Sequence, residues 1–201
     1  LAGPSQLVTL AVDVARTPDG TMVVLADRAQ APSGAGYALE NRQVMSRVMP
    51  SLYRSMQVHR LAPFFQTLNR SLTEGTGRQA DDPGIVLLST GPESRIYFEQ
   101  ALLSRYLGYP LVESEDLTVR KGEVFLKKLN GLEPVHAIFR YMTDANIDPF
   151  LGRHVVGGVA GLIQAFRQQV EEKIIESDQF KKVFEENEEL KPYEEQTKKL
   201  I

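Results

Sequence analysis

The stretch GIVLLSTGPES, residues 84–94, decides the fold. GIVLLS is a continuous apolar run, which is typical of a β-strand buried on both faces. A tight loop follows, and residues 95–107 then show an amphipathic helical pattern that Gly108 stops. Further short strands are expected at 110–113 and 135–141. The order strand, loop, helix, strand predicts an α/β layer with parallel strands.

Two other patterns lie in this part of the chain. Residues 117–120 and 123–126 read as a hairpin closed by Lys121-Gly122. Residues 155–169 begin glycine-rich and end as a helix. The polar, glycine-rich segment 75–83 precedes the whole arrangement and predicts a domain boundary.

The residues before that boundary follow another pattern. Strands are expected at 7–14 and 22–25, joined by a Pro18-Asp19-Gly20 turn, and helices at 37–49 and 61–74. We therefore predict three parts: residues 1–74, residues 84–170 and an acidic helical tail, 171–201. The tail carries ten acidic and six basic residues, whereas the remaining 170 residues are nearly balanced. Its irregular apolar stripe would dock on the body or on a partner, or the tail is a solvated charged helix.

Composition excludes several functions. The 201 residues have a net charge of −3, which argues against nucleic-acid binding and against attachment to anionic membranes. There is no cysteine, so disulfides and thiolate metal sites are excluded, and the three histidines have no zinc-like spacing. No apolar run approaches the roughly 20 residues of a membrane span. Because the chain begins at Leu1 and shows no signal peptide, we interpret it as a piece of a longer cytoplasmic protein.

The stretch ADRAQAPSGAGYALENR, residues 26–42, carries the main candidate site. After a proline, Ser33, Gly34 and Gly36 let backbone N–H groups approach phosphate oxygens, and the helix that follows presents its N-terminus to anions. Its Asn41 and Arg42 could contact phosphate or a substrate carboxylate, and Asp27 at a strand end could hold Mg²⁺. The alternative is a hairpin exit that leads into a well-capped helix.

A second candidate site follows the apolar strand. Ser89 and Gly91 lie at its carboxyl end, where open α/β sheets bind ligands, and Glu99 lies on the next helix. A tight strand-to-helix turn with a surface glutamate is the alternative. Arg140 and Asp148 could bind a carboxylate and an amine, although a surface ion pair explains them as well.

Several long motifs, in the right order, resemble the circularly permuted ATP-grasp family, type 2, which is related to glutathionylspermidine synthase. They are LADRAQAPSGAGYALENR, VHRLAPFFQTL, VLLSTGPESRIYFEQALLSRYLGYPLVESEDLTVRKGEVFLKKLNGLEPV, DANIDPF and GVAGLIQAFR, and they span roughly residues 7–170. The resemblance implies an α/β (α+β) fold. It would comprise a partial ATP-grasp half and a Rossmann-like pre-ATP-grasp domain, moved to the middle of the chain by the permutation.

The resemblance also implies a chemistry. ATP-grasp enzymes use ATP and Mg²⁺ to activate a carboxylate as an acyl phosphate, which an amine then attacks to give an amide. It implies nucleotide binding by Ser33, Gly34 and Gly36, metal binding by Asp27 and catalytic roles for Asn41 and Arg42. Ser89, Gly91, Glu99, Arg140 and Asp148 would bind substrates, small or peptide-like carboxylates and amines. Such proteins are often encoded with, or fused to, alpha-E and transglutaminase-like proteins, which are possible partners.

The chain departs from the family pattern in two places. Many relatives have Glu-Asp-Asn where this chain has Ala26-Asp27-Arg28, and Arg in place of Gln30, so a carboxylate and an amide ligand are missing. After Val170 the sequence no longer follows the family, and the subdomain that covers the adenine is not recognisable. We therefore expect the isolated chain to be inactive, with an exposed apolar face that favours a homodimer. The other hypothesis is a non-catalytic ATP-grasp-like scaffold that binds a partner protein.

Overall fold

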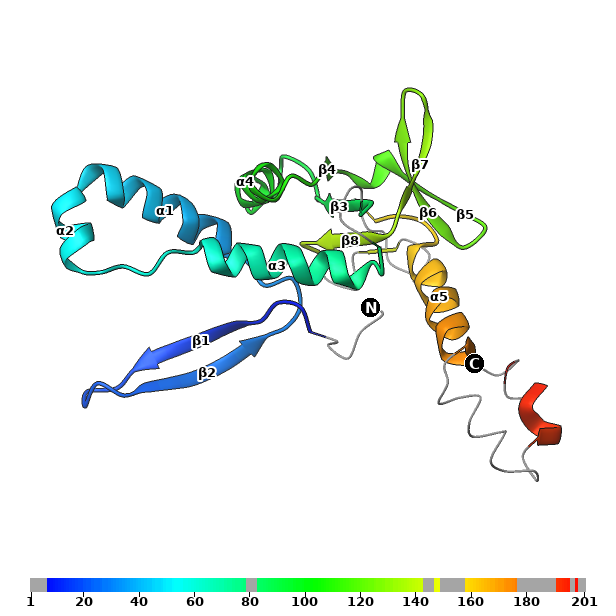
Figure 1. Ribbon diagram of the computed structural model, residues 1–201, viewed down its shortest axis with the longest axis horizontal. Helices are drawn as coiled ribbons and strands as arrows, with labels where there is room; N and C mark the ends of the chain where they lie inside the picture. Colours follow the sequence, from blue (N-terminus) through cyan, green and yellow to red (C-terminus); the bar gives the residue numbers. More distant parts are fainter. Residues whose placement is uncertain are drawn as a thin grey trace.

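The computed structural model describes residues 7–78, 83–142, 147–148, 158–176, 191–195 and 198 (Figure 1). This part of the chain mixes helices with three small sheets, as the α+β prediction requires. The helices are α1 (Ala35–Val48), α2 (Pro50–Ser55), α3 (Ala62–Gly75), α4 (Tyr97–Leu107) and α5 (Leu162–Glu176), with short 3-10 turns η1 (Ser114–Asp116) and η4 (Lys191–Tyr193). The strands are β1 (Ala11–Arg16), β2 (Met22–Arg28), β3 (Ile85–Leu88), β4 (Leu111–Val112), β5 (Leu117–Arg120), β6 (Glu123–Lys128), β7 (Gly131–Val135) and β8 (Ala137–Arg140).

Strand β3 is the centre of the fold. It lies between β4 and β8 and pairs with both in parallel, so that Leu88 is opposite Val112 on one side and Arg140 on the other. All four of its residues are buried. The buried parallel strand predicted from GIVLLS is therefore confirmed, and α4 follows it as the predicted helix.

The two faces of β3 contribute to two different clusters. Ile85 and Leu87 pack with residues of the helices, namely Leu39, Phe65, Leu68, Leu72, Leu103 and Leu107. Val86 and Leu88 point the other way, into a cluster with Leu117, Val124, Leu126, Val135, Leu162 and Ala165. The parallel sheet thus has α1, α3 and α4 on one side and the β5-β6-β7 sheet with α5 on the other (Figure 1).

Helix α3 belongs to the core around the parallel sheet. Its buried residues are Phe65, Leu68 and Leu72, all in the cluster of Ile85 and Leu87. Phe64, next to Phe65 in the sequence, is about half exposed. The boundary predicted at 75–83 stays a prediction. The packing nevertheless shows that the segments before and after it share one apolar cluster.

The hairpin of β1 and β2 is a two-stranded ribbon that extends away from the sheets (Figure 1). Its turn is the predicted one, because the Gly20 N–H donates to the Thr17 carbonyl over 2.9 Å and Gly20 has a φ of 91°. Every residue of β2 is exposed. Since side chains alternate along a strand, apolar groups are exposed on both faces of the ribbon, namely Val12, Val14, Met22, Val23, Val24 and Leu25.

The strand expected at 135–141 is confirmed as β8, Ala137–Arg140, whereas β7, which ends at Val135, was not predicted. The two strands lie in different sheets, on either side of His136. The sequence pattern did not predict β7 because this strand contains Gly131 and Pro134, and both residues are unfavourable inside a strand. β7 lies at the edge of its sheet, where a proline without an N–H is tolerated.

Helix α5 starts at Leu162 and continues to Glu176, beyond the predicted residue 169. The predicted tail falls mostly outside the described residues, as do residues 149–157. Among the described helices, none has both the length and the apolarity that a membrane crossing requires.

Candidate functional site

Three neighbouring parallel strands end at one edge of the sheet. Ser89 follows β3, Glu113 follows β4, and Arg140 is the last residue of β8. Because β3 pairs with both neighbours in parallel, these carboxyl ends lie side by side. Ligands of open α/β sheets bind at such edges. The structure therefore places the backbone of the predicted residues Ser89 and Arg140 side by side, with Glu113 as an addition. Their side chains lie on opposite faces of the sheet, because Arg140 is in register with Leu88, the residue before Ser89.

Ser89 is buried and fixed by two hydrogen bonds. Its hydroxyl donates to Gln100 Oε1 over 2.5 Å and accepts from the Gly91 N–H over 3.0 Å. Gly91 has a φ of 92°, and a Cβ there would lie 3.3 Å from Glu113 Oε2. The loop is thus the tight strand-to-helix turn that was considered as the alternative. Ser89 holds this turn against α4.

Replacing Ser89 with alanine is expected to cost about 1–3 kcal/mol of unfolding free energy, because it leaves Gln100 Oε1 and the Gly91 N–H without their buried partner. Urea denaturation followed by circular dichroism measures this cost. The matched control is Ser33→Ala at an exposed serine, which should change stability by less than about 0.5 kcal/mol. Equal effects of the two substitutions would show that the Ser89 network does not stabilise the turn.

Glu99 is fully buried at the start of α4, where it contacts the glycine loop. Its Oε1 accepts hydrogen bonds from the N–H groups of Gly34 over 2.7 Å and Gly36 over 2.9 Å, and its Oε2 accepts from Gly34 over 2.9 Å. A Cβ at Gly36 would lie only 2.7 Å from Glu99 Cγ. The surface glutamate considered from the sequence is therefore wrong. Glu99 joins the two candidate sites.

The N-terminus of α1 explains why a carboxylate is held there. Gly34 is its N-cap residue, with no side-chain cap, and the first turn contains no acidic residue. The free N–H groups and the helix dipole favour a negative charge at this point. Glu99 supplies that charge from a segment 63 to 65 residues further along the chain.

Aromatic contacts also connect α1 with the start of α4. The rings of Tyr37 and Phe98 stack with centroids 5.6 Å apart, and the Tyr37 hydroxyl donates to the Arg95 carbonyl over 3.3 Å. Burial raises the pKa of the Tyr141 phenol, and the negative charge of Glu99 raises it further. Tyr141 therefore stays protonated and neutral near this carboxylate.

The residues predicted to bind phosphate occupy different environments. Ser33 and Asn41 are exposed, whereas the N–H groups of Gly34 and Gly36 already donate to Glu99. Arg42 is half-buried, and its Nε is buried without a hydrogen-bond partner among the described residues. Their roles in nucleotide binding and catalysis stay predictions.

The predicted metal ligand is exposed. Asp27 lies in β2 opposite Val12, and the neighbouring Arg28 forms an ion pair with Asp13 over 2.6 Å. Within the described ranges, no group of three or more His, Asp or Glu residues could hold a metal ion. A hard cation requires several oxygen ligands, so these residues alone do not fit Mg²⁺.

Asp148 and Arg140 are more buried than a surface ion pair would be. Asp148 is buried, and its Oδ2 accepts from the Ile163 N–H near the start of α5 over 3.1 Å. Arg140 is half-buried and donates from Nη1 to the Met142 carbonyl over 2.9 Å. Both side chains fix the local backbone, and binding of a substrate by them stays a prediction.

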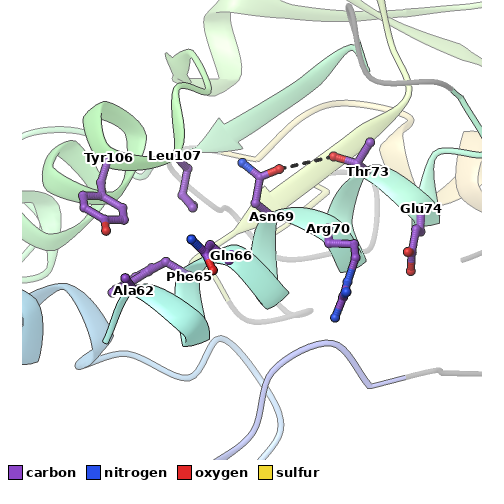
Figure 2. Close-up of a pocket in the computed structure, with 9 residues that line it drawn as sticks. All are labelled: Ala62, Phe65, Gln66, Asn69, Arg70, Thr73, Glu74, Tyr106 and Leu107. Carbon is purple, nitrogen blue, oxygen red and sulfur yellow. Dashed lines mark hydrogen bonds between the residues drawn. The ribbon is translucent and has the colours of Figure 1, made fainter. Parts of the chain in front are cut away.

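An open groove along α3, lined by polar and apolar side chains, was not predicted. Figure 2 shows Gln66 and Asn69 of α3 on the side of Tyr106 and Leu107 of α4, whereas Arg70 points away from them; the groove has a volume of about 520 Å³. The Thr73 hydroxyl donates to Asn69 Oδ1 over 3.4 Å. The signal in the sequence is the polar spacing of residues 66, 69, 70 and 73, which lie on one helix face beside the face of the buried Phe65, Leu68 and Leu72.

Comparisons with known proteins give relatives for most of the chain. The family model described as circularly permuted ATP-grasp type 2 matches residues 1–172. An uncharacterized protein of Mycobacterium tuberculosis is 40% identical over 166 residues, which cover 82% of this chain and 19% of that protein. Uncharacterized proteins of Mycobacterium leprae and Synechocystis are 36% and 32% identical over 157 residues, 78% of this chain and 28% and 33% of theirs. The chain therefore spans a third or less of the length of these relatives.

Proposed function

Because the chain belongs to the circularly permuted ATP-grasp type 2 family, we propose that it is part of an ATP-dependent carboxylate–amine ligase. In this reaction a substrate carboxylate attacks the γ-phosphorus of ATP, and ADP leaves. The acyl phosphate is then attacked by an amine, phosphate departs, and an amide remains. The substrates would be small or peptide-like carboxylates and amines. The observation that carries the proposal is the family match over residues 1–172.

The contact between Glu99 and the glycine loop supports a division of roles between the two candidate sites. The side chains around the glycine loop, namely Ser33, Asn41 and Arg42, would contact the phosphates. The strand ends at Ser89, Gly91 and Arg140 would face the acceptor substrate. Glu99 lies between them, because it is hydrogen-bonded to the loop and belongs to the helix after β3. A nucleotide and an acceptor substrate that bind together could therefore contact both candidate sites.

ATP and Mg²⁺ belong to this proposal through the family. Since the described residues do not form a Mg²⁺ site around Asp27, the other oxygen ligands would come from parts of a longer family member. Alpha-E or transglutaminase-like proteins would be partners, and the protein would work in the cytoplasm. Neither nucleic acid nor membrane is expected as a partner, given the net charge of −3.

A non-catalytic scaffold is the second candidate function. The observation that favours it is the β1-β2 ribbon, whose apolar side chains are exposed on both faces. Isolated two-stranded hairpins are marginally stable in water, so such a ribbon benefits from a cover. A partner protein or a second copy of the chain would provide it.

Titration calorimetry with Mg-ATP on a full-length relative tests the ligase proposal. Saturable heat at millimolar nucleotide or below supports it, and the absence of binding favours the scaffold. Light scattering of the 201-residue chain provides the complementary readout. A scaffold whose apolar ribbon is covered by a second copy of the chain should dimerise with rising concentration.

We predict that the 201-residue chain folds but does not hydrolyse ATP. Its two apolar clusters provide a core, whereas catalysis requires a nucleotide enclosed between two subdomains and neutralised by metal. A phosphate-release assay with ATP, Mg²⁺ and a mixture of carboxylates and amines measures this. Turnover that is lost in Asp27→Ala would contradict the prediction.

A further inference from the structure

Glu99 occupies the place that a bound anion would take. Three N–H···O contacts of 2.7–2.9 Å connect its carboxylate to Gly34 and Gly36 at the N-terminus of α1. Hydrogen bonds of this length to a charged acceptor are among the strong ones in proteins. These N–H groups are therefore satisfied without any ligand.

The environment of Glu99 favours this arrangement. The side chain is fully buried, and a buried charge is tolerated only where hydrogen bonds and opposite charge compensate it. The positive end of the α1 dipole and the two glycine N–H groups provide that compensation. Glycine at position 36 is required for the approach, because a Cβ there would lie 2.7 Å from Glu99 Cγ.

We propose that Glu99 is an internal anion, a positioning residue that fixes the glycine loop to α4 and keeps external phosphate away from the Gly34 and Gly36 N–H groups. This inference revises the prediction that the Gly34 and Gly36 N–H groups bind phosphate. It does not depend on the proposed ligase function. Any phosphate that binds at the loop would have to displace a carboxylate that packing already holds in place. Nucleotide phosphates would instead be contacted by side chains around the loop.

The test uses the 201-residue chain with isotope-labelled glycine, so that the Gly34 and Gly36 amide resonances can be followed. Phosphate and formate at millimolar concentrations should leave both resonances of the wild-type chain unmoved. In Glu99→Ala both resonances should shift on removal of the carboxylate. Added formate, which replaces that group, should move them back towards their wild-type positions in a saturable way.

Matched variants separate charge from folding. Glu93→Ala removes the same charge at an exposed position six residues earlier and should change neither resonance. Glu99→Gln keeps the shape of the side chain and one acceptor oxygen. If Glu99→Ala fails to fold, this variant still shows how the Gly34 and Gly36 amide resonances respond to loss of the charge. It should shift both resonances partway. Saturable movement of the wild-type Gly34 and Gly36 amides with phosphate would overturn the proposal, as would unchanged resonances in Glu99→Gln.

Discussion

Replacing Gly36 with alanine is expected to destabilise the chain by about 3 kcal/mol, because the new Cβ would lie 2.7 Å from Glu99 Cγ. That atom belongs to a fully buried side chain and cannot move away freely. Either the carboxylate or the start of α1 must shift, and the hydrogen bonds from Gly34 and Gly36 then lengthen. Urea unfolding followed by circular dichroism measures the loss.

A double-mutant cycle makes this prediction specific. Alanine is a better helix former than glycine by about 1 kcal/mol, so Gly36→Ala should be neutral or stabilising once the clash is gone. In a Glu99→Ala background the Cγ is absent, and the substitution should therefore change sign. Equal destabilisation in both backgrounds would show that the contact with Glu99 is not the cause.

The sequence predicted the parts of the fold that depend on local pattern. The apolar run around Leu87 predicted a strand buried on both faces, and the Pro18-Asp19-Gly20 turn predicted the first hairpin. Both signals lie within a few residues, and a neighbouring element cannot easily override them. β7 escaped prediction because its stability comes from pairing with β6, which compensates for the unfavourable Pro134.

The candidate site was predictable by residue but not by contact. The glycine loop and Glu99 were both identified, yet as a phosphate site and a substrate residue 63 to 65 positions apart. Their hydrogen bonds depend on how α1 packs on α4, and no local spacing encodes that packing. A buried glutamate on an otherwise amphipathic helix has the same sequence appearance as a surface one.

The two adjacent phenylalanines of α3 give the second large effect. Phe65 is 2% exposed and Phe64 is 46% exposed, although they are adjacent in the sequence. The Phe65 ring lies 4.9 Å from the Tyr106 ring and packs in the cluster with Ile85 and Leu87. The two residues therefore test the same substitution in a buried and an exposed setting within one turn of helix.

Phe65→Ala is expected to cost about 3–5 kcal/mol of unfolding free energy, because the buried ring is lost and a cavity remains between α3 and α4. Phe64→Ala should cost about 1 kcal/mol, chiefly through its edge contact with Phe65, whose centroid is 5.1 Å away. Urea unfolding of both variants measures the difference.

If residues before and after the 75–83 segment unfold as one unit, Phe65→Ala will lower the midpoint for probes on α3 and on the β5-β6-β7 sheet equally. A lower midpoint on α3 alone would show that the boundary predicted from the sequence separates two folding units, despite the shared cluster.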